Sequence, residues 1–176
     1  MERIRTAVIG CGKVGHFHAQ AFKDIENSEF VACLSRSQEK ADEFASQYGI
    51  KGYTNLKKMV EEQNVQAVSI CTPHPNHAEY AVECCRLGVH VAIEKPLASS
   101  LEDCDAIIEA AKENDVVGTT ICQRRFYKPA MRVKQAIVDG KIGTPILGTV
   151  NMLGWRDMAY YASDPWRGTW QGEGGG

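Results

Sequence analysis

The sequence predicts an α/β fold, in which a parallel β-sheet is covered by helices on both faces. Two observations support this prediction. Short apolar segments rich in Val, Ile and Thr alternate with longer segments of helical periodicity over most of the chain. A glycine-rich loop, "GCGKVG", directly follows the first apolar segment and opens the first helical segment. Because parallel strands need crossover connections, and these are right-handed, we expect the sheet to be doubly wound.

Each predicted strand is a short apolar run, mostly of β-branched residues, which is typical of buried strands. In chain order the runs span residues 4–10, 29–35, 65–72, 89–95 and 116–122, and the brief segment 51–54 is a weaker sixth candidate.

The predicted helices lie between these strands. The first has an apolar face formed by Val14, Phe17, Ala21 and Ile25, and the second has one formed by Ala41, Phe44, Ala45 and Tyr48, with Gly49 as its C-cap. Pro75 fits the first turn of a helix that runs to about residue 87 and is closed by Gly88. Ser99 or Ser100 fits the N-cap of the next helix.

The character of the sequence changes after Cys122. We expect a helix to begin near Pro129 and a strand to run from Ile146 to Trp155. That strand would need hydrogen-bonded neighbours, and no further strand is predicted after it. The sequence therefore predicts one complete domain over residues 1–123 and the incomplete beginning of a second over residues 124–176.

Composition excludes several classes of partner. The chain has 176 residues, a formal net charge of −2 and no block of Lys or Arg longer than a pair, so neither nucleic acid nor an anionic membrane surface is indicated. No apolar run approaches the ~18–20 residues of a membrane span, and no signal peptide is evident. The seven cysteines include no C-x-x-C pair. They predict reduced thiols in a cytoplasmic protein and no metal site.

The glycine loop indicates a dinucleotide site of the Rossmann type. Gly10, Gly12 and Gly15 have the G-x-G-x-x-G spacing between a strand and a helix. The first glycine allows a tight turn, the second a close approach to a pyrophosphate, and the third close packing of helix on strand. The helix N-terminus, with Lys13 and Val14, then offers free N–H groups and partial positive charge to the phosphates.

The residues after the second strand indicate which dinucleotide is preferred. NAD-preferring domains carry Asp or Glu there, which binds the ribose 2′-hydroxyl. This chain has Ser35 and Arg36, a hydroxyl and a guanidinium that suit a 2′-phosphate. We therefore expect NADP to be the preferred cofactor, with NAD possible, although Arg36 could also be an ordinary solvated loop residue.

With these motifs in place, the sequence resembles the Gfo/Idh/MocA family, the glucose–fructose oxidoreductase and inositol dehydrogenase group. The resemblance spans nearly the whole chain. It rests on "AVIGCGKVGHFHAQAF", "SICTPHPNHAEYAVECCRLGVHVAIEKPLA", "QRRFYKPA" and "DPWRGTW". It implies an N-terminal Rossmann domain, followed by an α/β substrate domain with an open antiparallel sheet. The activity it implies is hydride transfer between a nicotinamide and a carbinol carbon of a sugar, cyclitol or nucleotide sugar.

The resemblance implies a catalytic role for the E-K-P motif at the end of the strand over residues 89–95. Lys95 would be the acid/base that takes or returns the hydroxyl proton, as a partly buried lysine can do near neutral pH. Glu94 would contact the cofactor near the nicotinamide ribose, and Pro96 would hold the loop. The alternative is a surface ion pair after a strand. The sequence leaves open whether the peptide before Pro96 is cis or trans.

Further cofactor-binding residues follow from the resemblance. Thr72, Pro73 and His77 would line the nicotinamide and ribose side of the site, whereas the role of His74 is open. The other positions that match the family's cofactor site are Gln123, Arg125, Trp166 and Arg167.

Two functions fit the sequence. The first is an NAD(P)-dependent sugar or cyclitol dehydrogenase, represented by its cofactor domain and the start of its substrate domain. The second is a non-catalytic dinucleotide-binding protein, and a methyltransferase is a weaker third option. Full-length members of the family continue for a comparable length, with a helix whose Asp and His complete the substrate site. The resemblance also implies a homo-oligomeric full-length form.

Overall fold

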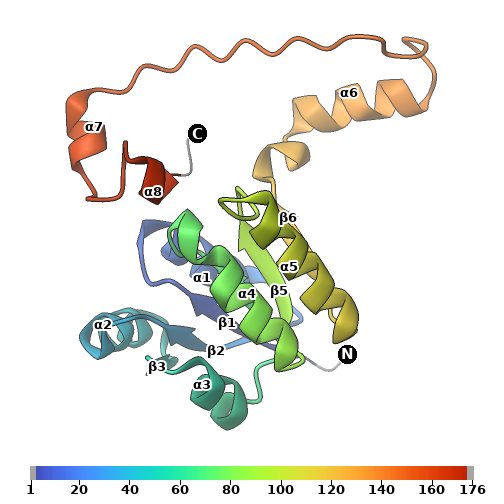
Figure 1. The fold of residues 1–176 in the computed structure, drawn as a ribbon. Helices are drawn as coiled ribbons and strands as arrows, with labels where there is room; N and C mark the ends of the chain where they lie inside the picture. Colours follow the sequence, from blue (N-terminus) through green and yellow to red (C-terminus); the bar gives the residue numbers. More distant parts are fainter. Residues whose placement is uncertain (1–2, 174–176) are drawn as a thin grey trace. The chain divides into compact units, whose positions relative to one another are not determined.

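The computed structural model describes residues 3–173 of the chain (Figure 1). The described residues form two compact units. The first contains residues 3–121 together with 168–173, and the second contains residues 122–167. None of the helices in these ranges is long and apolar enough to cross a membrane.

The first unit is built on a six-stranded sheet with the order β3-β2-β1-β4-β5-β6, in which all neighbouring strands are parallel. The strands are β1 (Ile4–Ile9), β2 (Ser28–Leu34), β3 (Lys51–Tyr53), β4 (Ala67–Ile70), β5 (His90–Glu94) and β6 (Gly118–Ile121). The predicted doubly wound sheet is confirmed, including the short strand β3. The strand order reverses between β1 and β4, and ligands of such folds bind beyond the carboxyl ends of the strands at that point.

Helices cover both faces of this sheet. They are α1 (Lys13–Asp24), α2 (Gln38–Tyr48), α3 (Leu56–Gln63), α4 (His77–Arg86) and α5 (Leu101–Glu113). One hydrophobic cluster joins Val8 and Cys33 to residues of α1 and α2, and a larger one joins Ile9 and Ile70 to residues of α3, α4 and α5. Side chains of β1 alternate between the two clusters because successive residues of a strand point to opposite faces.

The face of α1 that packs on the sheet differs from the prediction. The apolar residues Val14, Phe17 and Ile25 are exposed, whereas Gly15 and Ala19 are buried. The cause is Gly15, whose close approach to the backbone of Gly10 fixes which side of the helix meets the sheet. The most apolar stripe of α1 therefore faces away from the core.

The other helix boundaries agree with the sequence. Gly49 ends α2 in the left-handed conformation, with φ 70°, and Ser100 caps α5 by accepting from the Asp103 N–H. A single 3₁₀ turn, η1 (His74–Asn76), contains Pro75 and leads into α4.

The second unit contains little regular structure. Its elements are the 3₁₀ turn η2 (Gln123–Phe126), α6 (Lys128–Val138) and α7 (Met158–Ala162), and the short helix α8 (Trp170–Glu173) belongs to the first unit. Pro129 lies in the first turn of α6, as predicted. The strand predicted for residues 146–155 is not formed: this segment has no strand partner, and Ile146 and Leu153 are almost fully exposed. A strand is completed by hydrogen bonds to a neighbour, so apolar character alone did not suffice.

Candidate active site

The three loop glycines are required for different reasons. At Gly10, φ is +106°, and an added Cβ would lie 2.8 Å from the carbonyl carbon of Cys71. At Gly15 an added Cβ would collide with the carbonyl oxygen of Gly10. At Gly12 an added Cβ would meet nothing within 4 Å, and the backbone conformation suits any residue. The fold thus requires the first and third glycines, whereas the second leaves open space at the N-terminus of α1, which fits a pyrophosphate.

The hydroxyl of Thr72 is a second feature of this edge of the sheet that fits a bound ligand. Its Oγ1 is buried and has no hydrogen-bond partner among the described residues, at the carboxyl end of β4. Buried hydroxyls are nearly always hydrogen-bonded in proteins, so an unpaired one needs an explanation. A dinucleotide at the switch point between β1 and β4 would supply one, and the contact of Thr72 with a cofactor stays a prediction.

Cys11, within the glycine loop, and Cys71, close to it, have shifted pKa values. A hydrogen bond from Cys33 lowers the pKa of Cys11, which lies between the first two glycines, although partial burial acts the other way. Burial raises the pKa of Cys71, at the end of β4, to about 12. Because the thiolate is the nucleophile, Cys11 is the more reactive thiol of this pair.

The end of β2 presents the residues expected to contact the ribose. The Ser35 N–H donates to the Tyr53 carbonyl at 2.9 Å, which fixes the chain as it leaves the sheet. Arg36 is exposed. Burial raises the pKa of Tyr80 on α4, and the positive charge of Arg36 opposes this shift. The guanidinium therefore lies near α4 without a carboxylate at residues 35–36 to neutralise it.

Glu94 is held by two residues that the sequence analysis missed. Its Oε1 lies 3.0 Å from Nε2 of His18, and Nδ1 of that ring lies 2.8 Å from the Ser69 hydroxyl. His18 comes three residues after Gly15 on the buried side of α1, and Ser69 lies inside β4. A polar residue in a buried strand, and a histidine one turn beyond the third glycine, were the available signals.

Lys95 follows directly and lies at the surface. Its side chain is exposed, so the described residues do not provide the partial burial expected for it. Its backbone N–H donates to Oε2 of Glu94 at 3.1 Å, and the Lys95–Pro96 peptide is cis.

His77 lies inside the protein and does not line an open site. The ring is fully buried, and its nitrogens Nδ1 and Nε2 lie 2.9 Å from the carbonyl oxygens of Pro96 and Thr72, respectively. Pro73 precedes η1, and the His74 ring lies 5.7 Å from that of His77. Direct contact of Pro73 or His77 with a cofactor stays a prediction.

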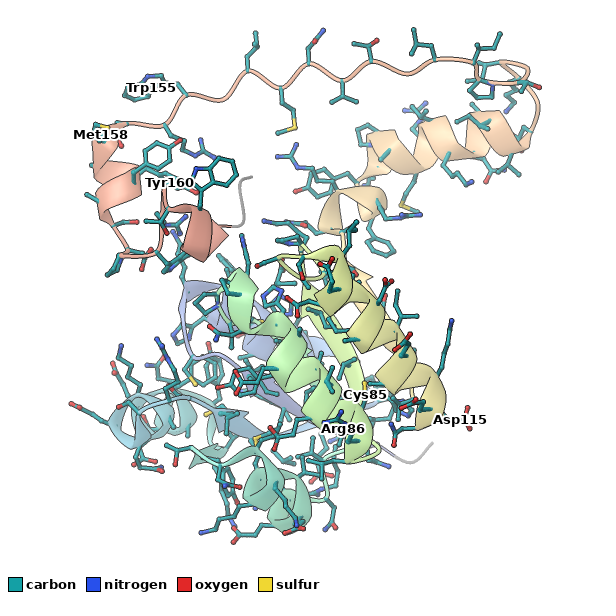
Figure 2. All side chains as sticks on the ribbon, viewed as in Figure 1. Cys85, Arg86, Asp115, Trp155, Met158 and Tyr160 are labelled. Atoms are coloured by element: carbon teal, nitrogen blue, oxygen red, sulfur yellow. The ribbon has the colours of Figure 1, made fainter. Side chains whose placement is uncertain are left out.

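The remaining predicted site residues lie in the second unit. Gln123 and Arg125 are exposed in η2. Arg167 bonds Asp164 at 2.9 Å, and its guanidinium lies 4.6 Å from the ring centroids of both Trp166 and Tyr160. Tyr160, labelled on α7 in Figure 2, is thus the centre of a small aromatic and cationic cluster. A role of these residues in cofactor binding stays a prediction.

The parallel sheet, its switch point and the glycine loop define a dinucleotide-binding Rossmann domain. Comparison with known proteins identifies the family. The family model described as an oxidoreductase family with an NAD-binding Rossmann fold, Gfo/Idh/MocA, matches residues 4–121. The chain belongs to this family.

Relatives and solved structures agree with this assignment. Myo-inositol 2-dehydrogenase of Thermotoga maritima is 34% identical over 143 residues, covering 81% of this chain and 43% of that protein. Oxidoreductase P35 of Formosa agariphila is 29% identical, covering 99% of this chain and 56% of that protein. The structure of the WlbA dehydrogenase from Chromobacterium violaceum, in complex with NADH and UDP-GlcNAcA, matches with a TM-score of 0.90 and 26% identity, covering 98% of this chain and 50% of that one. The chain spans about half the length of these relatives.

Proposed function

We propose that this chain is the cofactor-binding part of an NAD(P)-dependent oxidoreductase that interconverts an alcohol and a carbonyl group on a sugar or cyclitol. The observation that carries the proposal is the position of Lys95, exposed at the carboxyl end of β5 beside a fixed Glu94. The open space at Gly12 and the unpaired Thr72 hydroxyl support a dinucleotide at the same edge of the sheet. Relatives named as inositol and apiose dehydrogenases support the substrate class.

Each residue of the site has a distinct task. The N-terminus of α1 and the loop N–H groups bind the pyrophosphate, while Ser35 and Arg36 bind the adenosine ribose and favour a 2′-phosphate. When bound, the nicotinamide supplies hydride acceptance or donation at the carbinol carbon. Lys95 handles the accompanying proton: the neutral amine takes it from the hydroxyl during oxidation, and the ammonium returns it during reduction. Glu94 orients the cofactor from the opposite side of the strand end.

The experiment compares binding with turnover. Calorimetric titration of the 176-residue chain with NADPH and NADH tests the cofactor site, and we expect saturable binding with one dinucleotide per chain. A chain extended to the length of the relatives is then assayed with inositols and aldoses, and we expect cofactor-dependent oxidation or reduction. Binding without turnover in the extended chain would support the alternative, a non-catalytic dinucleotide-binding protein. Absence of binding would overturn both.

A further inference from the structure

Two histidines contact the residues on either side of Lys95: His77 is fully buried, and His18 is partly buried. His18 bonds the residue before it, Glu94, and His77 lies against the carbonyl of the residue after it, Pro96. His18 belongs to α1 and His77 to α4, so elements that cover opposite faces of the sheet converge on one turn.

The His18 side is a continuous chain of hydrogen bonds. The Ser69 hydroxyl lies 2.8 Å from Nδ1 of His18, and Nε2 lies 3.0 Å from Oε1 of Glu94. Because a carboxylate oxygen only accepts, Nε2 is the donor of the second bond, and both ring nitrogens have a partner. The second oxygen of Glu94 accepts from the Lys95 N–H. The chain thus runs from the interior of β4 to the backbone of Lys95. The side chains of His18 and Glu94 are only 17% and 15% exposed, so little water competes for these hydrogen bonds.

This arrangement does not support hydrolytic chemistry, although it combines a serine, a histidine and a carboxylate. Ser69 is 1% exposed and lies inside β4, between strands β1 and β5. No substrate reaches a hydroxyl in that position. What the arrangement does is fix the carboxylate of Glu94 in one orientation.

The His77 side joins two loops that border the same edge of the sheet. Both ring nitrogens lie 2.9 Å from carbonyl oxygens, which only accept hydrogen bonds. The neutral ring donates to one of them, and the imidazolium donates to both. The imidazolium, or the neutral tautomer with its proton on Nδ1, ties the Pro96 carbonyl to the start of α4, and the ring is fully enclosed. Pro96 has no N–H of its own, so this carbonyl is the only backbone hydrogen-bonding group it offers.

We propose that His18 and His77 are positioning residues that set the orientation of Glu94 and Lys95 before the cofactor binds. The proposal rests on the proposed function, and it adds which residues hold Glu94 and Lys95 in place. Active-site groups contribute most when supporting residues lock them in place, and an exposed lysine at a strand end has no other support among the described residues.

The first test measures the turn directly, without any cofactor. Hydrogen exchange of the Lys95 amide is followed by NMR in wild type, His18→Ala, Ser69→Ala and the double variant, with thermal melts to establish folding. We expect exchange to be about tenfold faster in His18→Ala, as for one lost charge-assisted hydrogen bond. Ser69→Ala should have a smaller effect, and no additional effect once His18 is absent, because both act through the same carboxylate. If His18→Ala does not fold, Ser69→Ala carries the test.

The matching variant and its control use other histidines of the same unit. His77→Phe keeps a planar aromatic ring, although a slightly larger one, and removes both hydrogen-bonding contacts, and in a variant shown to fold by its thermal melt it should shift the Lys95 resonance. His90→Gln is the control, because His90 lies at the opposite end of β5 and accepts from the Val117 N–H at 3.0 Å. It should leave Lys95 unchanged. Folded His18→Ala and His77→Phe variants with an unaltered Lys95 amide would overturn the proposal.

The second test is calorimetric titration with NADPH. We expect about tenfold weaker binding in His18→Ala and partial recovery in His18→Gln, whose amide can donate to Glu94. Equal affinities in wild type and both variants would contradict the proposal while leaving the proposed function intact. A wild-type chain that binds no NADPH would overturn the proposed function, and the exchange experiment would then decide this inference by itself.

Discussion

Two apolar segments of the chain differ in structure: β4 is a buried strand, whereas residues 146–155 form no strand and are exposed. In β4, Val68 and Ile70 are buried between strands β1 and β5. In the later segment, Leu147 and Trp155 are exposed and no strand is formed. The difference lies in their neighbours. Strand β4 is hydrogen-bonded to β1 on one side and to β5 on the other, whereas the later segment has no strand partner among the described residues. The cofactor site is thus built on a sheet whose strands all find partners within residues 3–121. The segment predicted to begin the substrate domain has no such sheet among the described residues.

Hydrogen exchange should show the largest contrast between the two segments. Amides of β4 open only with most of the sheet, whereas those of residues 146–155 have no ladder partner. We expect at least about a thousandfold slower exchange in β4, as for core strands compared with exposed segments. Mass spectrometry of peptic peptides measures both. Similar protection would mean that residues 146–155 find a partner in solution.

Replacing Lys95 tests whether the first unit, which holds the complete sheet, also supplies the group that transfers the proton. In the extended enzyme, Lys95→Ala should lower kcat by about 10²–10⁴-fold, the usual contribution of a general acid or base, while NADPH affinity changes little. Lys95→Arg should not restore activity, because a guanidinium stays protonated. Near-normal kcat in Lys95→Ala across the pH range would assign the proton to another group.

Two glycine substitutions separate folding from binding. Gly15→Ala forces a side chain against the Gly10 backbone, and overpacking of this kind should cost about 3 kcal/mol of unfolding free energy. Gly12→Ala enters open space and should cost less than about 1 kcal/mol, as for a changed N-cap. It should nevertheless weaken dinucleotide binding about tenfold or more, since ~1.4 kcal/mol of lost contact suffices. Urea melts measure the unfolding free energies, and calorimetric titrations measure the binding. Unchanged affinity in Gly12→Ala would show that the pyrophosphate does not occupy the space at Gly12.

Arg36 tests the preference between cofactors. Arg36→Ala should weaken NADPH binding about tenfold, as for one lost charge-assisted hydrogen bond, and leave NADH binding unchanged. Tighter binding of NADH than NADPH by the wild type, unaffected by the substitution, would show that Arg36 is only a solvated loop residue.

Thiol labelling gives the smallest and most local readout. At pH 8 iodoacetamide should modify Cys11 faster than Cys71, because burial raises the pKa of Cys71 to about 12 and keeps it protonated. Saturating NADPH should slow the labelling of Cys11 if the glycine loop lies against the cofactor. Peptide mass spectrometry measures both rates, and equal rates for the two thiols would contradict the assigned environments.

The sequence predicted well whatever depends on local chemistry. The buried strands β1, β2, β4 and β5, the αL glycine after α2 and the Ser100 cap each follow from a few adjacent residues. The last predicted strand is formed as β6, but it lies at the edge of the sheet and none of its residues is buried. It predicted poorly what depends on contacts between distant segments. The buried face of α1 is set by Gly15 against Gly10, and the partners of Glu94 come from α1 and β4. Spacing in the sequence indicated neither, because His18 and Glu94 are 76 residues apart.

The exposed segment 146–155 also has a consequence for handling the protein. The chain has a net charge of −2 at pH 7 and a pI near 6.2, so charge repulsion between molecules is weak and vanishes in mildly acidic buffer. An unpaired apolar segment is then free to meet its counterpart on another molecule. We expect turbidity and light scattering of concentrated solutions to be greatest near pH 6. Both should fall at pH 8, because the chain is then more negatively charged and its molecules repel one another.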